Sequence, residues 1–413
     1  VGVEKDGSDK KINSSTIFEA ASLSKPVFAY AVLRLYDRGL IDIDKPLLNY
    51  IGTYERFDAK NPNYGKITAR MVLRHTTGLS NWGDEKSVGF LFPPDSCFSY
   101  SGEGYQFLQK VLEKKLNKSL NDIIQEEVFT PLKMESSSYV WNDKFAAVSS
   151  FGNSAEVINR HKNSNAAFSL LTNAQDFSIF LQALIKGVGL KPVTHKMMFE
   201  KQSRANRFKS KPRPADKYID WGLGVGLQQN EHGKSVWHWG DNGSYKCFFM
   251  VYPKRNEFLV YFTHSLNGLN ITDEIAKLFF GNQTCWVVKW LDYGYKSPVL
   301  IKELKAELAK KGYEYAREVV KEKKQKDSKY ELSETDLNSL GYSLLQKEEI
   351  GKAVEIFKLN VSLFPESWNV YDSYGEALFK HGKKEEAVKM YQKSLELNPK
   401  NENAKKALEQ ILK

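Results

Sequence analysis

The feature that most constrains the fold is a repeat of 34 residues in the last third of the chain. Four pairs of similar residues stand 34 positions apart: Gly341 and Gly375, Ala353 and Ala387, Phe357 and Tyr391, and Pro365 and Pro399. A glycine on a first helix, alanine and an aromatic residue on a second, and a closing proline describe a repeated pair of helices. The period therefore predicts that this part of the chain is all helical.

This pattern resembles the tetratricopeptide repeat, in two copies. Residues 401–412 predict a capping helix, needed because the last repeat would otherwise expose its apolar face. Residues 301–328, rich in Lys, Glu and Ala, predict a helical connector. We expect a connector over residues 291–330 and a repeat domain over residues 331–413. The repeats could hold a peptide partner on a concave surface or dock on the rest of the chain, and the sequence leaves both open.

Composition and charge bound what the remaining residues can be. A chain of 413 residues predicts two or three domains. The sequence contains no run of about 18 apolar residues, so no membrane span is predicted. The net charge is +10, but the lysines cluster among glutamates without a nucleic-acid motif, so no nucleic-acid partner is expected. The three cysteines, Cys97, Cys247 and Cys285, are odd in number and lack metal spacing, which indicates neither a disulfide framework nor a metal site.

A candidate nucleophile precedes residues 27–36, an apolar segment long enough for a buried helix. Ser22 stands at the start of this helix and Lys25 follows three residues later, so both side chains share one face. A half-buried ammonium has a lowered pKa and can take a serine's proton, while free amides of the first turn can hold an oxyanion. The spacing alone is weak evidence, because Ser8 and Lys11 share it and a capping serine with a surface lysine is commoner.

Two further residues with aromatic rings, Tyr100 and His75, are candidates for the site. Tyr100 lies in a predicted loop before a helix expected over residues 105–116, where a tyrosine is usually a packing residue. His75 lies in a short capped helix predicted over residues 67–79 and ending at a glycine. We favour a structural role for His75 because no second metal-type residue is spaced beside it.

A run of antiparallel strands is predicted near residues 220–227, 236–243, 247–252 and 258–263. The glycines on either side of Asp241 leave a strand edge bare, so the backbone of a ligand could lie close to it. An ordinary turn would explain the same residues.

In chain order, Ser22-Leu23-Ser24-Lys25, Tyr100-Ser101-Gly102 and His238-Trp239-Gly240 resemble the three active-site motifs of the serine β-lactamase and penicillin-binding-protein superfamily. The likeness is to its class C β-lactamase-like branch, which includes esterases and D-peptidases. Residues 73–80 and 169–176 resemble that branch's "LLxHTSGL" and "STAxD" segments. The resemblance covers roughly residues 14–285 and implies an α+β fold, with an antiparallel sheet flanked by helices, a helical lobe and a cleft between them.

The resemblance implies a role for each motif residue. Ser22 would attack an ester or amide carbonyl, and Lys25 and Tyr100 would together accept and return its proton. The oxyanion would lie between the backbone amides of Ser22 and Asp241. No metal or organic cofactor is expected.

Three departures from the family pattern bear on the substrate. Gly102 stands where asparagine is usual, which removes an amide that would hold the acyl side chain. His238 replaces lysine, and is expected to be a weaker, pH-dependent anchor for a carboxylate, while bulky Trp239 narrows the strand edge. The family's strands ahead of the nucleophile helix also have no visible counterpart in residues 1–21. We therefore expect that they are missing from a β-lactamase-like domain of residues 1–290, or that another segment covers that edge of the sheet.

The sequence therefore predicts a serine acyl-hydrolase with a tetratricopeptide tail, acting on a small-molecule or peptide substrate. An acyltransferase would use the same acyl-enzyme on Ser22. A non-catalytic ligand-binding module, with the repeats recruiting a partner, is disfavoured because a binder does not need Ser22, Lys25 and Tyr100 together. Residue 1 is valine with no visible signal peptide, so the chain is expected to start after processing or to lack its natural start. Only the family resemblance favours a periplasmic or extracytoplasmic location.

Overall fold

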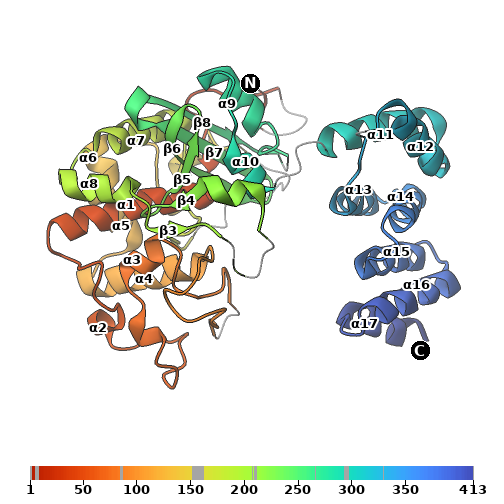
Figure 1. Cartoon of the computed structure of the whole chain (residues 1–413), viewed down its shortest axis with the longest axis horizontal. Helices are drawn as coiled ribbons and strands as arrows, with labels where there is room; N and C mark the ends of the chain where they lie inside the picture. Colours follow the sequence, from red (N-terminus) through yellow and green to blue (C-terminus); the bar gives the residue numbers. More distant parts are fainter. Residues whose placement is uncertain are drawn as a thin grey trace. The chain divides into compact units, whose positions relative to one another are not determined.

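The computed structural model describes residues 2–4, 9–83, 87–150, 162–206, 208, 212–265, 267–292, 297–328 and 330–412. It divides the chain into two compact units, Val1–Tyr293 and Gly294–Lys413 (Figure 1). The first unit combines helices with antiparallel strands, and the described residues of the second form helices alone, in agreement with the expected α+β domain followed by an all-α domain. None of the helices described is both long enough and hydrophobic enough to cross a membrane.

The first unit contains ten α-helices among its described residues, together with eight strands. The helices are α1 (Ser24–Asp37), α2 (Leu48–Ile51), α3 (Ala69–Leu73), α4 (Gly102–Leu116), α5 (Leu120–Ile124), α6 (Thr130–Leu132), α7 (Ala174–Lys186), α8 (Pro192–Phe199), α9 (Thr272–Phe280) and α10 (Trp286–Leu291). The strands are β1 (Phe18–Glu19), β2 (Leu171–Thr172), β3 (Ser203–Arg204), β4 (Ile219–Trp221), β5 (Gly226–Asn230), β6 (Gly233–Asn242), β7 (Tyr245–Tyr252) and β8 (Glu257–Thr263).

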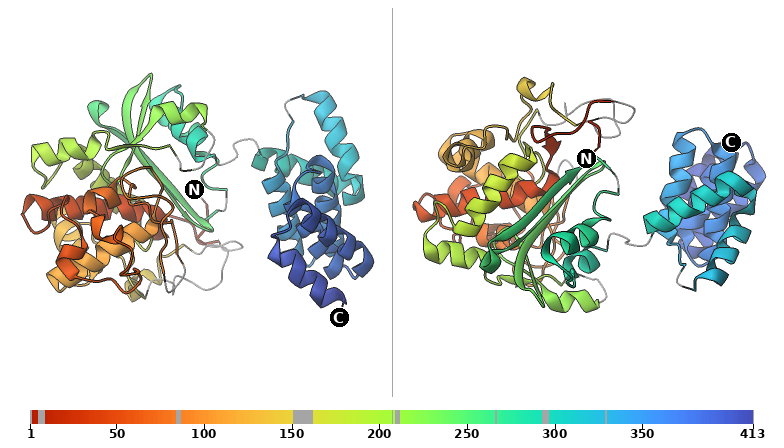
Figure 2. Two further views of the ribbon diagram at one scale, coloured as in Figure 1. Left: turned by 60° about the horizontal axis from the view of Figure 1, so that its bottom comes forward. Right: turned by 90° about the horizontal axis from the view of Figure 1, so that it is seen from above.

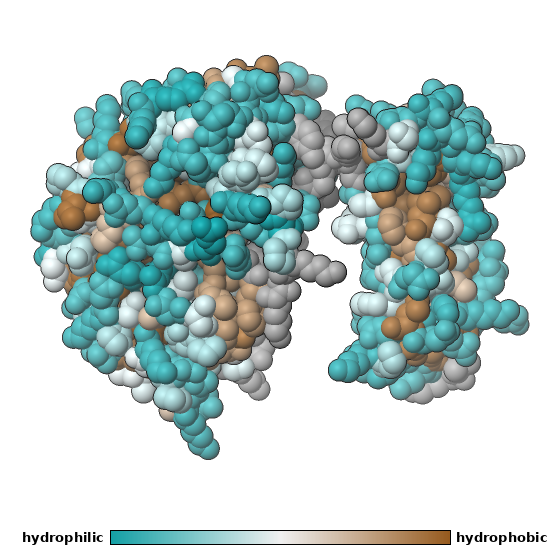
Figure 3. All heavy atoms as spheres, viewed as in Figure 1, coloured by the Kyte–Doolittle hydropathy of each residue, from teal (hydrophilic) through white to brown (hydrophobic). Residues whose placement is uncertain are grey.

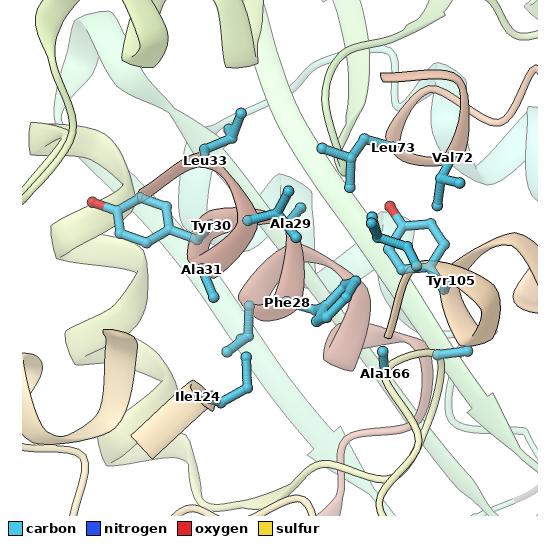
Figure 4. Close-up of a cluster of buried hydrophobic side chains, with 14 of the residues drawn as sticks. Phe28, Ala29, Tyr30, Ala31, Leu33, Val72, Leu73, Tyr105, Ile124 and Ala166 are labelled. Carbon is cyan, nitrogen blue, oxygen red and sulfur yellow. The ribbon is translucent and has the colours of Figure 1, made fainter. Parts of the chain in front are cut away.

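Helix α1 is the centre of the first unit, and it confirms the helix predicted after Ser22. Eleven of its fourteen residues are buried, so it is enclosed on all sides rather than lying on the surface. Figure 4 shows Phe28 and Tyr30 of α1 among side chains from α3, α4 and α5, including Leu73, Tyr105 and Ile124. Burying each such side chain contributes about 1.5–3 kcal/mol, so the start of α1 is held firmly in place.

The six-stranded sheet has the antiparallel order β3-β4-β5-β6-β7-β8, which confirms the predicted run of strands. Helix α7 packs through Phe177 on Phe249 of β7, and α10 packs through Trp290 on Trp237 of β6. Phe249 lies directly opposite His238, the neighbour of Trp237, so Phe249 and Trp237 point to opposite faces of the sheet. Helices therefore cover both faces, as the view from above also shows (Figure 2).

Two local predictions differ from the structure. The helix expected over residues 67–79 ends at Leu73, because His75 has a φ of +58°, a left-handed conformation that cannot continue a helix. Residues ahead of Ser22 do include a strand, β1, but it pairs with β2 about 150 residues later in the chain and does not join the six-stranded sheet. Two residues are too few for an alternating pattern, so β1 left no signal that the sequence could reveal.

The second unit stacks seven helices in its described residues: α11 (Ser297–Lys311), α12 (Ala316–Lys326), α13 (Glu334–Gln346), α14 (Ile350–Leu363), α15 (Trp368–Lys380), α16 (Lys384–Leu397) and α17 (Glu402–Leu412). A side chain on Gly341 would meet Phe357 at 2.4 Å, and one on Gly375 would meet Tyr391 at 3.1 Å. The 34-residue period therefore repeats one close contact between helices. Apolar residues of α11 and α12 belong to the same core as those of the repeats, and on the face in view hydrophobic side chains lie between hydrophilic margins (Figure 3).

Candidate active site

Ser22 lies in η1 (Ala21–Leu23), a single 3-10 turn directly ahead of α1. Ala21 has a φ of +47°, a conformation that costs a residue with a side chain about 1–3 kcal/mol. The Ser24 hydroxyl donates to the Ala21 carbonyl oxygen at 2.5 Å, and both residues are fully buried, so the surrounding core holds the turn in this conformation. The result is a half-buried Ser22 side chain that reaches the cleft.

Lys25 is a buried amine beside the candidate nucleophile. Its side chain is 1% exposed, and Nζ donates to Ser22 Oγ at 3.2 Å and to the carbonyl oxygen of Ala167 at 2.8 Å. Burial disfavours the ammonium and lowers the Lys25 pKa from 10.5 to about 7. A substantial fraction is therefore neutral near pH 7, and a neutral amine at this distance can accept the serine proton.

Tyr100 lies next to Lys25, with Lys25 Nζ 4.7 Å from the centre of its ring. Tyr100 also packs on His75: their ring centres are 4.4 Å apart, and the backbone N–H groups of the two residues that flank Tyr100 donate to His75. Ser99 N donates to the His75 carbonyl oxygen at 2.9 Å, and Ser101 N donates to His75 Nδ1 at 3.1 Å. Because Nδ1 accepts, the proton of the neutral ring is on Nε2, and burial lowers the His75 pKa well below its usual value.

The placement of His238 corrects the prediction of a pH-dependent carboxylate anchor. The ring is fully buried, and in the described part of the chain it is not among the residues that line the cleft. Its Nδ1 donates to the Trp239 carbonyl oxygen at 2.8 Å. Burial and the nearby charge of Lys25 lower the His238 pKa from 6.5 to about 3, so the ring is neutral at pH 6 to 8 and carries no charge for a substrate.

The remaining motif residues lie around these groups. A side chain on Gly240 would come within 2.6 Å of the Ala20 carbonyl oxygen, so glycine is what allows β6 to approach the Ser22 turn. Strand β5 pairs with β6 only as far as Trp237, and in the described structure the later part of β6 pairs with β7 alone. This agrees with the expected bare strand edge at Asp241, whose carboxylate forms an ion pair with Lys246.

These groups meet in a cleft of about 530 Å³. Of the predicted site residues, Ser22, Lys25, Tyr100, Trp239 and Asp241 line it, whereas His238, Gly240 and Gly102 do not. Residues that the sequence did not indicate complete the lining: Glu19, Asn81, Trp82, Phe168 and Asn242. Asn81 and Trp82 directly follow, and Phe168 directly precedes, the segments that resemble the family, which is the one signal that could have pointed to them.

Polar contacts join the two ends of this lining. Asn242 Nδ2 donates to Glu19 Oε2 at 2.8 Å and to the Phe168 carbonyl oxygen at 3.3 Å. The described residues contain no group of three or more His, Cys, Asp or Glu side chains arranged to hold a metal ion. The cleft brings together a serine, an amine and a phenol, beside the carboxylates of Glu19 and Asp241.

The chain belongs to the β-lactamase family, whose model matches residues 1–278, and a tetratricopeptide repeat model matches residues 368–401. Members of this family are typically serine hydrolases, and stacked repeats of the second kind form concave binding surfaces.

Named relatives share parts of the first unit. Penicillin-binding protein 4* of Bacillus subtilis is 28% identical over 147 residues, 30% of this chain and 31% of the relative. Esterase EstB of Burkholderia gladioli is 33% identical over 75 residues, 18% of each chain. The matches thus span less than a third of each relative. A penicillin-binding protein from Bacillus halodurans has the same fold, with a TM-score of 0.57 at 18% identity over 68% of this chain and 91% of that chain.

Proposed function

We propose that this protein is a serine acyl-hydrolase that cleaves a neutral ester through an acyl-enzyme on Ser22. The observation that carries the proposal is the buried Lys25 amine, 3.2 Å from Ser22 Oγ and with a pKa of about 7. Burying a lysine so that its pKa falls does not stabilise the fold. A general base, in contrast, needs a pKa near the working pH, so the lowered pKa favours a catalytic role.

Acylation follows from this arrangement. The neutral Lys25 amine accepts the hydroxyl proton as Ser22 Oγ bonds to the carbonyl carbon. The carbonyl oxygen becomes an oxyanion between the backbone N–H groups of Ser22 and Asp241. The bond from the carbonyl carbon to the alcohol oxygen then breaks, and the alcohol takes the proton through Tyr100, which leaves the acyl group on Oγ.

Deacylation reverses the proton path. Water attacks the acyl carbon and gives its proton to Tyr100 and Lys25. The bond between the acyl carbon and Ser22 Oγ breaks, Oγ recovers its proton, and the carboxylic acid leaves.

The charges around the cleft favour a neutral substrate over a carboxylate. Among the described lining residues Lys25 is the one cation, and it faces Ser22 rather than the far end of the cleft. His238 is neutral, and Lys246 is paired with Asp241. A penicillin or a D-alanyl peptide would bring its carboxylate to a wall that contains Asp241 and Glu19. The name of the relative EstB agrees with ester cleavage.

The nucleophile is tested with a fluorophosphonate, which captures an activated serine covalently. The adduct is expected on the peptide that contains Ser22, and is expected to vanish in Ser22→Ala. Ser178→Ala is the matched control, because this exposed hydroxyl only donates within α7. Labelling that persists in Ser22→Ala would exclude the assignment.

Substrate preference is tested by comparing kcat/KM for one nitrophenyl ester, one penicillin and one D-Ala-D-Ala peptide at pH 6 and pH 8. The ester is expected to be preferred by about tenfold or more, since only it lacks the carboxylate. A penicillin preferred by about tenfold at both pH values would contradict the proposal and would mean that another cation binds the carboxylate.

A further inference from the structure

Gly102 makes room for the indole of Trp82. A Cβ built on Gly102 would lie 2.4 Å, 2.7 Å and 2.7 Å from three atoms of the six-membered ring of Trp82. Gly102 is the first residue of α4 and has an ordinary helical backbone, so its conformation does not require glycine. Glycine is required at this position because of the contact with Trp82.

The residues on both sides of Trp82 are tied to the start of α4. Gly102 N donates to Asn81 Oδ1 at 2.9 Å and to the Asn81 carbonyl oxygen at 3.1 Å. On the other side, Gly83 N donates to Glu103 Oε1 at 2.9 Å, and Glu103 is only 3% exposed. The indole is therefore held in position although it is 48% exposed. A tryptophan that only filled the core would be buried, whereas the exposed part of the Trp82 ring is available to contact a ligand.

Trp82 belongs to an aromatic lining of the cleft that contains the nucleophile. It meets Phe168 edge to face, with ring centres 5.7 Å apart and planes at 76°. In the same cleft, the ring centres of Tyr100 and Trp239 are 4.8 Å apart. All four rings line the cleft that contains Ser22. Ring faces and edges in this arrangement favour a flat aromatic group over a small or charged one.

We propose that Trp82, admitted by Gly102, forms a subsite that selects an aromatic acyl group. This inference rests on the proposed function, because it names the class of ester that the same site accepts: an ester of an arylacetic or similar aromatic acid. The indole takes the place of the amide that the Tyr-x-Asn pattern of the family would provide here. An apolar surface replaces a polar one, which changes the group selected from an amide to a ring.

The test compares kcat/KM for nitrophenyl phenylacetate with that for nitrophenyl acetate, which share their leaving group. The full chain is expected to prefer the phenylacetate, and Trp82→Ala is expected to lower the preference by about tenfold. Trp82→Phe should retain most of it, because an aromatic ring remains. Trp286→Ala is the matched control: this indole stacks on Tyr218 outside the cleft, and its loss should leave the preference unchanged.

A second variant tests the role of Gly102 without removing the indole. Gly102→Val should displace Trp82 and lower the phenylacetate preference to the same degree as Trp82→Ala. Because both changes remove one feature, the double variant should lose little more. A preference that neither variant changes would overturn the inference, as would equal kcat/KM for the two esters in the unaltered protein.

The failure of this inference and that of the proposed function give different results. Labelling of Ser22 by a benzyl and by a methyl phosphonofluoridate measures the subsite without any ester turnover. Faster labelling by the benzyl reagent, reduced in Trp82→Ala, supports the subsite even if the esters are poor substrates. Equal labelling by both reagents overturns the subsite alone, whereas a Ser22 that neither reagent labels overturns the proposed function and the subsite together.

Discussion

Each wall of the cleft belongs to an element that contains a buried nitrogen base, and burial has opposite consequences for the two bases. The helical wall is formed by Ser22, Lys25 and Tyr100, and the strand wall by Trp239, Asp241 and Asn242 of β6, the strand that also contains the buried His238. Lys25 and His238 are both almost completely buried, and burial is the largest cause of the lowered pKa in each. Lys25 Nζ contacts Ser22 Oγ, whereas the ring nitrogen of His238 binds a backbone oxygen of its own strand.

The comparison shows that the same effect, burial, can make a proton acceptor of Lys25 and leave His238 without a charge. An amine starts with a pKa of 10.5, and burial brings it to about 7, where it can exchange protons. An imidazole starts at 6.5, and the same effect takes it to about 3, where it stays neutral. In the proposed mechanism, proton transfer is therefore confined to the helical wall, and the strand wall contributes backbone amides and an aromatic face.

The largest expected effect comes from removing either proton carrier of the helical wall. Lys25→Met and Tyr100→Phe should each lower kcat/KM for a nitrophenyl ester by roughly 10²–10⁴. Since the two side chains move one proton between them, the double variant should lose little more than either single one. The measurement is kcat/KM for the three variants beside the unaltered protein.

A double variant whose loss equals the product of the single losses would show two independent roles. If neither single substitution changes kcat/KM, the helical wall is not the catalytic one, and the comparison fails. Thermal unfolding of each variant controls for a general loss of structure.

The next effect concerns how His75 positions Tyr100. His75→Phe keeps a ring under the tyrosine but leaves the buried Ser101 N–H without an acceptor, and should lower kcat/KM by roughly ten- to a hundredfold. His75→Asn provides an amide oxygen for that N–H and tolerates the φ of +58° at this position. It should recover part of the rate that His75→Phe loses.

Equal losses in kcat/KM for His75→Phe and His75→Asn, with equal losses in unfolding free energy, would mean that His75 only fills space. The pH dependence of kcat/KM should keep its midpoint in both variants, because His75 is itself neutral throughout this range.

Much of the fold was predictable because its signals are local. The apolar run after Ser22 predicted α1, runs of apolar and aromatic residues between turn residues predicted β6 to β8, and the 34-residue period predicted the stacked helices α13 to α17. Each of these elements is long enough to repeat its own pattern several times. The family resemblance also implied that Ser22, Lys25 and Tyr100 share one cleft, and all three line it.

The missed features depend on contacts between distant parts of the chain. The burial of His238 arises where its ring packs against Trp221 and Tyr100, which no pattern around residue 238 could indicate. The packing of Trp82 against Gly102 joins two segments twenty residues apart, and only the contact between them reveals it. The features on which the proposed specificity rests were therefore harder to predict than the residues of the proposed catalytic site.

A smaller effect sharpens the comparison through pH. If neutral Lys25 is the active form and its pKa is about 7, the active fraction rises from about one tenth at pH 6 to about nine tenths at pH 8. The value of kcat/KM for a nitrophenyl ester should therefore rise about tenfold, followed at a wavelength where both forms of nitrophenol absorb equally. A rate that stays constant or falls over this range would contradict a catalytic amine.

The smallest expected effect on catalysis comes from the strand wall at His238. A glutamine can keep the hydrogen bond to the Trp239 carbonyl oxygen, so His238→Gln should change kcat/KM by less than about threefold. The stability should change in its pH dependence instead. The folded pKa of about 3 lies below the unfolded value of 6.5, so the unfolded chain binds the proton first as the pH falls.

The contribution of His238 to stability is thus complete above pH 6.5 and decreases as the pH falls toward 3, by up to about 1.4 kcal/mol for each pH unit. Urea unfolding at pH 7 and pH 5 should show a smaller difference between the two pH values in His238→Gln than in the unaltered protein. His238→Lys would bury a cation without a partner and should be less stable at pH 7 by several kcal/mol. A His238→Lys protein that is stable and turns over penicillins in preference to esters would break the comparison, because the strand wall would then offer a charge to the substrate after all.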